Sequence, residues 1–385
     1  MGDIAKVNTV EAADIASVNS VAKADIAKIG TADLPAGGAT LWTIVGADGA
    51  VATAAHADLN AWTGYVSADM STSDYNAISF GKDGSAAPLW VAVDDNGTKE
   101  IRYSSDPTGT AGWSNANVTG KQYAVLWGNN VWISVGQNGT LYRSTDGASW
   151  SAVDMSGATG WYTTGVDVRH LASDGAGTWM CDNHDFIFKS TDDGATWAKV
   201  YDTADAPLSD DDYRIRGIAY TVYGGTARWV VLTRKSSNTR VIHATAADTS
   251  SWTLATLDGG TVTGQNLIAH TNRHIAAAAG TVIMAVGDNI SRSTDGGQDW
   301  TYTSDDGNDL PRTDAKGLAT DGNGTWVVVH DSGRVSVSTS DGAPGSWAEQ
   351  TGVQDGGSNT NLRFPTGGAN VENLDAVCAD VLLPV

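Results

Sequence analysis

The stretch KSTDDGATW, residues 189–197, recurs along the chain in recognisable copies. RSTDGASW ends at residue 150, RSTDGGQDW at residue 300 and STSDGAPGSW at residue 347. In such a turn the Ser and Asp side chains can bond otherwise unpaired backbone groups, and Gly permits a positive φ. We therefore expect a structural turn at each copy. The pattern Ser-x-Asp-x-Gly-x-x-Trp is complete twice, at Ser190, Asp192, Gly194 and Trp197, and at Ser293, Asp295, Gly297 and Trp300.

Tryptophan marks the same period. Seven tryptophans recur at intervals of 37 to 55 residues: Trp62, Trp113, Trp150, Trp197, Trp252, Trp300 and Trp347. About twenty residues before each lies an apolar position, which is Trp42, Trp90, Trp132, Trp179, Trp229, Val282 or Trp326. Thirteen of the 15 tryptophans fall in these two registers, which indicates a repeated structural unit.

Each unit is typical of four short strands. Around Trp326, the segments KGLATDG, TWVVVHD, RVSVSTSD and SWAEQ are separated by the glycine turns GNG, DSG and GAPG. A four-stranded unit of about 40 to 50 residues is the period of a β-propeller blade. One blade cannot bury both of its faces alone, so blades pack around an axis. The sequence therefore predicts an all-β fold, a seven-bladed β-propeller.

The two ends of this region complete one blade. The first unit begins at LWTIVGADG, residues 41–49, which corresponds to a second strand, and no first strand precedes it. The segment NLDAVCADVLLPV, residues 373–385, has the pattern of the missing innermost strand. Pairing the two would close the ring and remove exposed strand edges. We expect a split closing blade and a propeller spanning residues 37–385.

The first thirty residues carry a different repeat. They align with themselves at a shift of 11 residues, as DIAKVNTVEAA, DIASVNSVAKA and DIAKIG. On a helix the apolar positions would share one side, although VNTV and VNSV have poor helix propensity, so a series of short turns is the alternative. We interpret residues 1–36 as a docking or oligomerising segment with a linker, and a segment lying on the main domain as the alternative. The docking residues are Ile4, Val7, Ile15, Val18, Ile26 and Ile29.

The complete turns resemble the Asp-box of sialidase-like β-propellers (BNR repeats). In those families the turn lies at the periphery, which implies a structural role here. The resemblance does not extend to the sialidase catalytic residues, because YRIRGIA, residues 213–219, lies in mid-chain without the family's proline. We interpret YRIR as a first strand. Some related propellers cleave glucans with paired aspartates, so a glycoside hydrolase using acidic residues on the loop face remains the alternative function.

Charge and composition limit the partners. The formal net charge is −21, which disfavours nucleic acid and anionic lipid. No apolar run is long enough for membrane insertion, and the start lacks the pattern of a signal peptide. Cys181 and Cys378 lie in apolar runs and are expected to be buried thiols. His270 and His274 lie where a strand is expected without accompanying ligands, so we predict no metal and no cofactor.

The loops that join blades, and those that join second to third strands, are where binding residues are expected. Trp161 and Tyr162 stand outside both tryptophan registers on one such loop; contact with a partner is one interpretation, and packing on the blade is the other. The candidate binding residues are Trp161, Tyr162, His184, Asp185, Arg234 and Lys235.

A tandem IAKVN-x-V segment followed by Asp-box units is similar to virion proteins of tailed bacteriophages. The resemblance implies a non-enzymatic tail or capsid protein that is assembled in the host cytoplasm and located in the virion. Its N-terminal segment would bind other virion proteins, with homo-oligomerisation as a further expectation. Its propeller would bind a host-surface glycan or another virion protein. An assembly factor acting inside a cell is a third hypothesis.

Overall fold

The computed structural model divides the chain, apart from its last two residues, into two compact units, Met1–Gly38 and Ala39–Leu383. In the first unit, β1 (Ser17–Val18) and β2 (Val21–Ala22) pair as antiparallel strands. These four residues depart from the helix that one interpretation of the 11-residue repeat favoured, in keeping with the poor helix propensity of valine. The predicted docking residues Ile4, Val7, Ile15, Ile26 and Ile29 lie outside the described residues, as does the side chain of Val18. The structure describes residues 17–18, 21–22, 41–70, 74–95, 100–109, 112–116, 118–236, 238–257, 260–261, 274–286, 289–302, 310, 315–330, 334–350 and 374–379.

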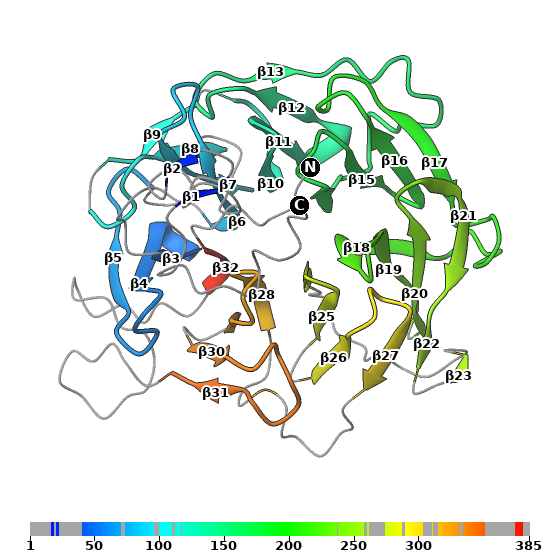
Figure 1. The fold of residues 1–385 in the computed structure, drawn as a ribbon. Helices are drawn as coiled ribbons and strands as arrows, with labels where there is room; N and C mark the ends of the chain where they lie inside the picture. Colours follow the sequence, from blue (N-terminus) through cyan, green and yellow to red (C-terminus); the bar gives the residue numbers. More distant parts are fainter. Residues whose placement is uncertain are drawn as a thin grey trace. The chain divides into compact units, whose positions relative to one another are not determined.

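The second unit is an all-β, seven-bladed β-propeller, which confirms the predicted fold (Figure 1). Blade 1 contains β32 (Leu374–Ala379), β3 (Leu41–Gly46), β4 (Ala50–Ala55) and β5 (Thr63–Val66). Blade 2 contains β6 (Tyr75–Lys82), β7 (Pro88–Asp94), β8 (Ile101–Ser104) and β9 (Ser114–Asn115). Blade 3 contains β10 (Gln122–Gly128), β11 (Val131–Gly136), β12 (Leu141–Ser144) and β13 (Ser151–Ala152). Blade 4 contains β14 (Leu171–Ser173), β15 (Trp179–Asn183), β16 (Phe186–Ser190) and β17 (Ala198–Asp202).

The remaining blades follow the same antiparallel order. Blade 5 contains β18 (Arg214–Tyr223), β19 (Thr226–Lys235), β20 (Asn238–Thr245) and β21 (Asp248–Leu254). Blade 6 contains β24 (His274–Ala278), β25 (Thr281–Val286), β26 (Asn289–Ser293) and β27 (Asp299–Tyr302), and its outer edge adds β22 (Thr256–Leu257) and β23 (Gly260–Thr261). Blade 7 contains β28 (Ala315–Thr320), β29 (Trp326–His330), β30 (Arg334–Ser338) and β31 (Ala348–Glu349). Short 3-10 turns, η2 (Ala47–Gly49) and η3 (Gln137–Gly139), follow the second strands of blades 1 and 3.

Blade 1 is split between distant parts of the chain, as predicted. β32 pairs antiparallel with β3, with Val377 opposite Ile44 and Ala379 opposite Trp42. The C-terminal segment therefore supplies the innermost strand of the blade whose other three strands begin the propeller (Figure 1). This pairing covers the strand edge that β3 would otherwise present.

The hydrophobic core lies between the blades. The described residues form seven buried clusters, and each cluster combines side chains of two adjacent blades. One example joins Ile133 of blade 3 to Trp179, Phe188 and Trp197 of blade 4. A twisted four-stranded sheet is apolar on both faces here, so it is stable only between two neighbours. Both cysteines are buried, and burial raises the pKa of the Cys181 thiol.

The two tryptophan registers have distinct positions. The first register stands at or near the start of the fourth strands, from Trp62 before β5 to Trp347 before β31. The second register lies on the second strands, where Trp132 in β11 and Trp179 in β15 have no exposed surface. Large indoles at these two places fill the wedge between blades, because the gap widens with distance from the axis.

The Ser-Asp-Gly-Trp turns join third to fourth strands. In blade 4 the Ser190 hydroxyl donates to the Asp192 carboxylate (2.7 Å) and accepts the Gly194 N–H (2.9 Å). The Trp197 indole N–H donates to the Gly194 carbonyl (3.0 Å). Burial acts to raise the pKa of Asp192, but hydrogen bonds from Thr196 and Ser190 outweigh it and leave that pKa below its usual value. The same three hydrogen bonds recur at Ser293, Asp295, Gly297 and Trp300.

These turns require glycine for a second reason besides its positive φ, which is the close approach of the neighbouring blade. A Cβ on Gly194 (φ +77) would lie 2.1 Å from Cδ1 of Ile133 in the preceding blade. A Cβ on Gly297 would lie 2.5 Å from Cγ2 of Val230, again one blade back. The turn therefore fixes the distance between neighbouring blades as well as closing its own hairpin.

We predict that Gly194→Ala lowers the free energy of unfolding by about 2–4 kcal/mol, because the methyl group both strains the left-handed backbone and overlaps Ile133. Gly157→Ala is the matched control, since no atom lies within 4 Å of a Cβ built there. Urea denaturation of both variants measures the difference. Equal stability of the two variants would show that the turn does not set the blade spacing.

Candidate functional site

Loops of two kinds share one end of every blade, because successive strands are antiparallel. They are the connections from second to third strands and the connections between blades. We call this end the loop face. The structure brings the six predicted binding residues together on the loop face of blades 4 and 5: Trp161, Tyr162, His184, Asp185, Arg234 and Lys235.

Trp161 and Tyr162 differ in role. The Trp161 ring meets Phe188 edge-on at a centroid distance of 4.8 Å, and its indole N–H donates to the Gly139 carbonyl (3.1 Å). Trp161 is therefore a packing residue of the loop between β13 and β14. Tyr162 is 42% exposed and stacks on Phe186 at 5.7 Å. The Tyr162 ring is thus held in place and presented to solvent.

His184 and Asp185 connect blade 4 to blade 5. His184 has a φ of +69, and its Nδ1 lies 2.7 Å from the Asp185 carboxylate. The ring of His184 also contacts Tyr162 edge-on at 5.8 Å. The other Asp185 oxygen lies 4.0 Å from the guanidinium of Arg214, at the start of β18. Asp185 therefore lies between the His184–Tyr162 ring pair of blade 4 and Arg214 of blade 5.

Arg234 and Lys235 end β19 on the same face. Lys235 forms ion pairs with Asp210 (2.7 Å) and Asp212 (2.9 Å), and these hydrogen bonds raise its pKa. Arg234 is paired in register with Arg214 on β18, and its Nε donates to the Ser236 carbonyl. Lys235 is thus neutralised within the loop face, while Arg234 stands beside a second arginine.

Sequence reasoning missed a further set of residues nearer the axis. Besides β32 of the split blade, four first strands carry a β-bulge near their start, each of which leaves one residue out of register. Bulges re-aim side chains and are frequent beside functional sites. The only sequence signal is an interruption of strand alternation, which a single sequence does not distinguish from a turn. The out-of-register residues are Asn76, Tyr123, Arg216 and Lys316.

Arg216 belongs to a group that we call the arginine cluster, together with Arg169, Arg214 and Arg234. Burial lowers the pKa of Arg216, Asp182 partly offsets this effect, and the other three arginines lower that pKa further. The Nε of Arg216 is buried without a hydrogen-bond partner among the described residues. Three guanidinium groups therefore lie close enough to Arg216 to disfavour its charged form, and two of them, Arg214 and Arg234, are register partners on adjacent strands.

Neighbouring groups extend the positive charge. The Arg169 guanidinium lies 3.9 Å from the centroid of the Tyr123 ring and pairs with Asp167 (2.8 Å). Burial lowers the pKa of His274, in β24, to about 4, and the charges of His170 and Lys316 act in the same direction. Basic groups of blades 4 and 7 thus lie close enough to the first strand of blade 6 to help keep His274 neutral at pH 7.

The buried carboxylates of this region hold the backbone. Asp182 accepts N–H groups of Arg169 (3.0 Å) and His170 (2.8 Å), and lies 3.2 Å from the His170 ring. Asp321, in the turn between β28 and β29 at the opposite end of blade 7, accepts the N–H groups of its own turn and lies 3.1 Å from His56. These carboxylates act as acceptors rather than as an acid–base pair. The described part of the chain contains no group of three or more His, Cys, Asp or Glu placed to hold a metal ion.

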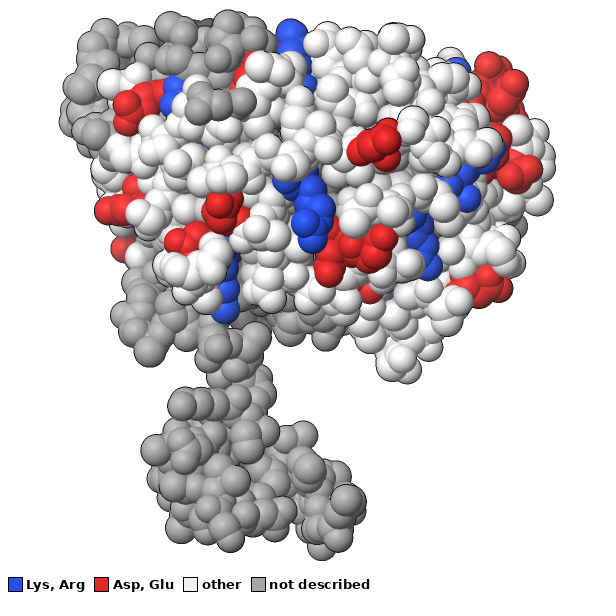
Figure 2. Space-filling view, turned by 90° about the horizontal axis from the view of Figure 1, so that it is seen from above, with Lys and Arg blue, Asp and Glu red and all other residues white. Residues whose placement is uncertain are grey.

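Charge elsewhere on the propeller is mixed. Viewed from above, acidic and basic side chains lie interspersed on the described surface (Figure 2). The arginine cluster is a local concentration of positive charge on a chain of net charge −21.

Among the described residues, no helix has both the length and the apolarity needed to cross a bilayer.

Comparison with known proteins establishes the class. No protein-family model and no curated protein matches this sequence. The structure is similar to YCF48 bound to D1 peptide (15% identity, TM-score 0.50, covering 75% of this chain and 84% of that one). It is also similar to apo AztD from Citrobacter koseri (10%, 0.51, 88% and 97%) and to the WD40 β-propeller domain of Doa1 (13%, 0.50, 76% and 86%). At these identities the likeness shows the fold alone, which is a β-propeller.

We predict that two adjacent substitutions destabilise the protein to different extents. Trp161→Ala should lower the free energy of unfolding by about 3 kcal/mol, because it removes a large packed ring and a hydrogen bond to Gly139. Tyr162→Ala should cost less than about 1 kcal/mol, because its ring is largely at the surface. Urea denaturation distinguishes them, and a larger loss for Tyr162→Ala would contradict the assigned roles.

Proposed function

We propose that this protein is a non-enzymatic binding module whose loop face, at blades 4 and 5, contacts a partner. The observation that carries the proposal is the arginine cluster, in which Arg214 and Arg234 are register partners on β18 and β19. Asp185 and His184 connect this pair to the exposed Tyr162 ring. Tyr and Arg are enriched among the residues that dominate binding energy. The buried carboxylates serve the backbone, which favours binding over glycoside hydrolysis.

The partner that fits this surface is an acidic segment of another protein. Guanidinium groups bind carboxylates through directed, charge-assisted hydrogen bonds. The strongly acidic chain would repel such a segment elsewhere, so the cluster would also determine where it binds. YCF48, a propeller of the same fold, has been solved with D1 peptide bound, which supports a polypeptide ligand.

The larger assembly that we propose is the virion of a tailed bacteriophage. Residues 1–36 would dock the protein onto the particle, and the propeller, residues 37–385, would bind another virion protein, with a host-surface glycan as the alternative. The support is the tandem 11-residue repeat, followed by turns that resemble the Asp-box. Repeated copies of one short segment suit repeated equivalent contacts on a particle.

Binding of an acidic peptide tests the loop face. We expect the double variant Arg214→Gln/Arg216→Gln to bind a fluorescent polyglutamate peptide at least about tenfold more weakly, a loss of about 1.4 kcal/mol. Arg292→Gln is the control, because Arg292 lies on β26 of blade 6 and pairs with Asp341. Fluorescence anisotropy at low and high salt measures both. Unchanged binding by the double variant would refute the proposed site.

Particle association tests the docking segment separately. We expect the full chain to co-sediment with phage particles, and a chain lacking residues 1–36 to remain in the supernatant while keeping its thermal unfolding transition. Quantitative immunoblotting of both fractions measures this. Co-sedimentation of the truncated chain at the full-length level would assign particle docking to the propeller instead.

A further inference from the structure

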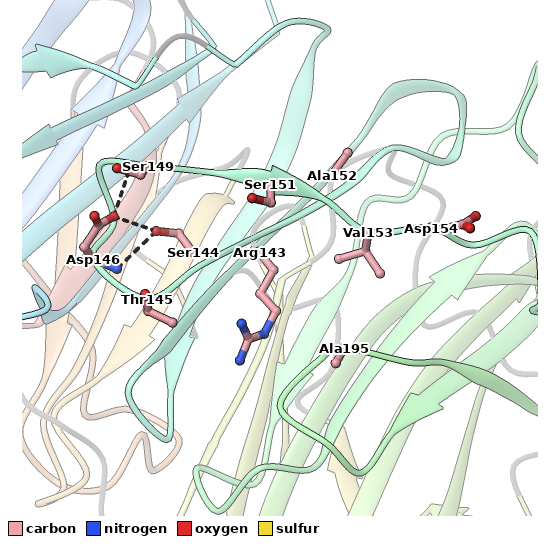
Figure 3. A pocket seen from close by; sticks show the side chains of 10 residues that line it. All are labelled: Arg143, Ser144, Thr145, Asp146, Ser149, Ser151, Ala152, Val153, Asp154 and Ala195. Atoms are coloured by element: carbon pink, nitrogen blue, oxygen red, sulfur yellow. Dashed lines mark hydrogen bonds between the residues drawn. The ribbon is translucent and has the colours of Figure 1, made fainter.

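A polar hollow of about 460 Å³ lies on the outer rim, between blades 3 and 4 (Figure 3). It stands beside the turn between β12 and β13, away from the arginine cluster. Its volume is within the range of small-ligand sites. The hollow is lined by Arg143, Ser144, Thr145, Asp146, Ser149, Ser151, Ala152, Val153, Asp154 and Ala195.

Arg143 is the one cation of this lining, and the protein holds it in place. Its Nε donates to the carbonyl of Asp193 in blade 4 (2.8 Å). Its two Nη atoms have no acceptor among the described residues, and Figure 3 shows the guanidinium projecting toward the space beside Ala195. A guanidinium already fixed through Nε loses little conformational entropy when it binds a ligand through its Nη atoms.

A second hollow, of about 160 Å³, occurs at the equivalent place between blades 6 and 7. The pentapeptide RSTDG is identical at both places, residues 143–147 and 292–296. Arg292 repeats the contact of Arg143, since its Nε donates to the carbonyl of Asp341 (2.9 Å). Here, however, Nη2 also donates to the Asp341 carboxylate (2.8 Å). The guanidinium of Arg292 is therefore already paired with a carboxylate of the protein.

Two positions account for the difference. In the second copy the Thr281 hydroxyl donates to the Asp341 carboxylate (2.6 Å), whereas Val131 takes the place of Thr281 in blade 3. Asp193 and Asp341 hold the same position, directly before the turn glycine, with φ of +58 and +55. Asn129 donates its side-chain N–H to the Asp193 carboxylate (2.7 Å), which turns it away from Arg143. The corresponding turn of blade 6 has Ala279, which lacks an amide, and Asn129 and Ala279 share a φ of +49. Because Asn129 holds the Asp193 carboxylate, the Nη atoms of Arg143 remain available to a ligand.

Carboxylates in the lining do not prevent an anion from binding. Asp146 accepts the N–H groups of Ala148 (2.9 Å) and Ser149 (2.7 Å), and Asp154 accepts that of Ser156 (2.9 Å). Their charge is thereby partly satisfied. The second hollow is also lined by two aspartates, Asp295 and Asp299, and the Asp341 carboxylate still pairs with its arginine.

We propose that the hollow between blades 3 and 4 binds an acidic sugar residue, whose carboxylate pairs with the Nη atoms of Arg143. The hydroxyl groups of Thr145, Ser149 and Ser151 line the same space and suit sugar hydroxyls, which both donate and accept hydrogen bonds. Asp341 in blade 7 is the protein's own example of the carboxylate contact. This site is on a different surface from the loop face, so either proposal stands or fails without the other.

The test uses glucuronic acid as the probe and glucose as the neutral sugar of matched size. Saturation-transfer NMR and calorimetry on the full chain should show glucuronic acid binding that Arg143→Gln weakens at least about tenfold. Arg292→Gln is the matched control and should bind as the unaltered chain does, because Arg292 is already paired. Glucose binding as tightly as glucuronic acid, or unchanged binding by Arg143→Gln, would overturn the proposal.

Asn129→Ala provides an independent test that leaves Arg143 in place. The variant removes the amide that holds the Asp193 carboxylate, so the carboxylate is released to pair with Arg143, and glucuronic acid binding should again fall at least about tenfold. Circular dichroism and thermal unfolding confirm folding of each variant. Unchanged binding by Asn129→Ala would refute the gating by Asn129. A glutamate-containing peptide that binds this hollow more tightly than glucuronic acid would overturn the assignment to a sugar.

Discussion

The packing of each blade against its neighbour is the constraint on which the rest of the structure depends. Seven buried clusters hold the ring together, and each belongs to two blades, so no blade has a complete core of its own. The spacing is set where the turn glycine of one blade meets a branched side chain of the previous blade, as Gly194 meets Ile133. Turn, tryptophan and neighbouring strand therefore form one repeated joint, and the loop face is free to vary.

Much of the fold was predictable from the sequence because its signals are periodic. Indoles at two fixed places in six of the seven units, and at one place in the seventh, indicated the blade number. The strand-like segment 373–385, which has no partner in its own unit, predicted the split blade. The interpretation of YRIR as a first strand is confirmed, since β18 begins at Arg214. The turn glycine's contact with the preceding blade was not predictable, because it depends on the distance between two blades.

The candidate site was predictable only in part. Loop position and the absence of a blade role selected Trp161 and Tyr162, but a sequence does not show that one ring is packed and the other exposed. Arg216 was hidden because its importance comes from a bulge and from arginines that are distant in sequence. The rim hollow was hidden for a related reason. The two copies of RSTDG are identical, and the difference between the two places comes from Asn129 and Thr281. Each lies in another hairpin of its blade and bonds the aspartate of the next blade.

The pairing of β32 with β3 has a consequence for synthesis on the ribosome. β3 is translated well before its innermost neighbour, Leu374–Ala379, which lies at the other end of the propeller's sequence. Until those residues emerge, the growing chain carries an open apolar edge that another polypeptide can extend. Ring closure between such distant segments also costs loop-closure entropy, so the pairing of β32 with β3 is a slow, late step in folding of the propeller.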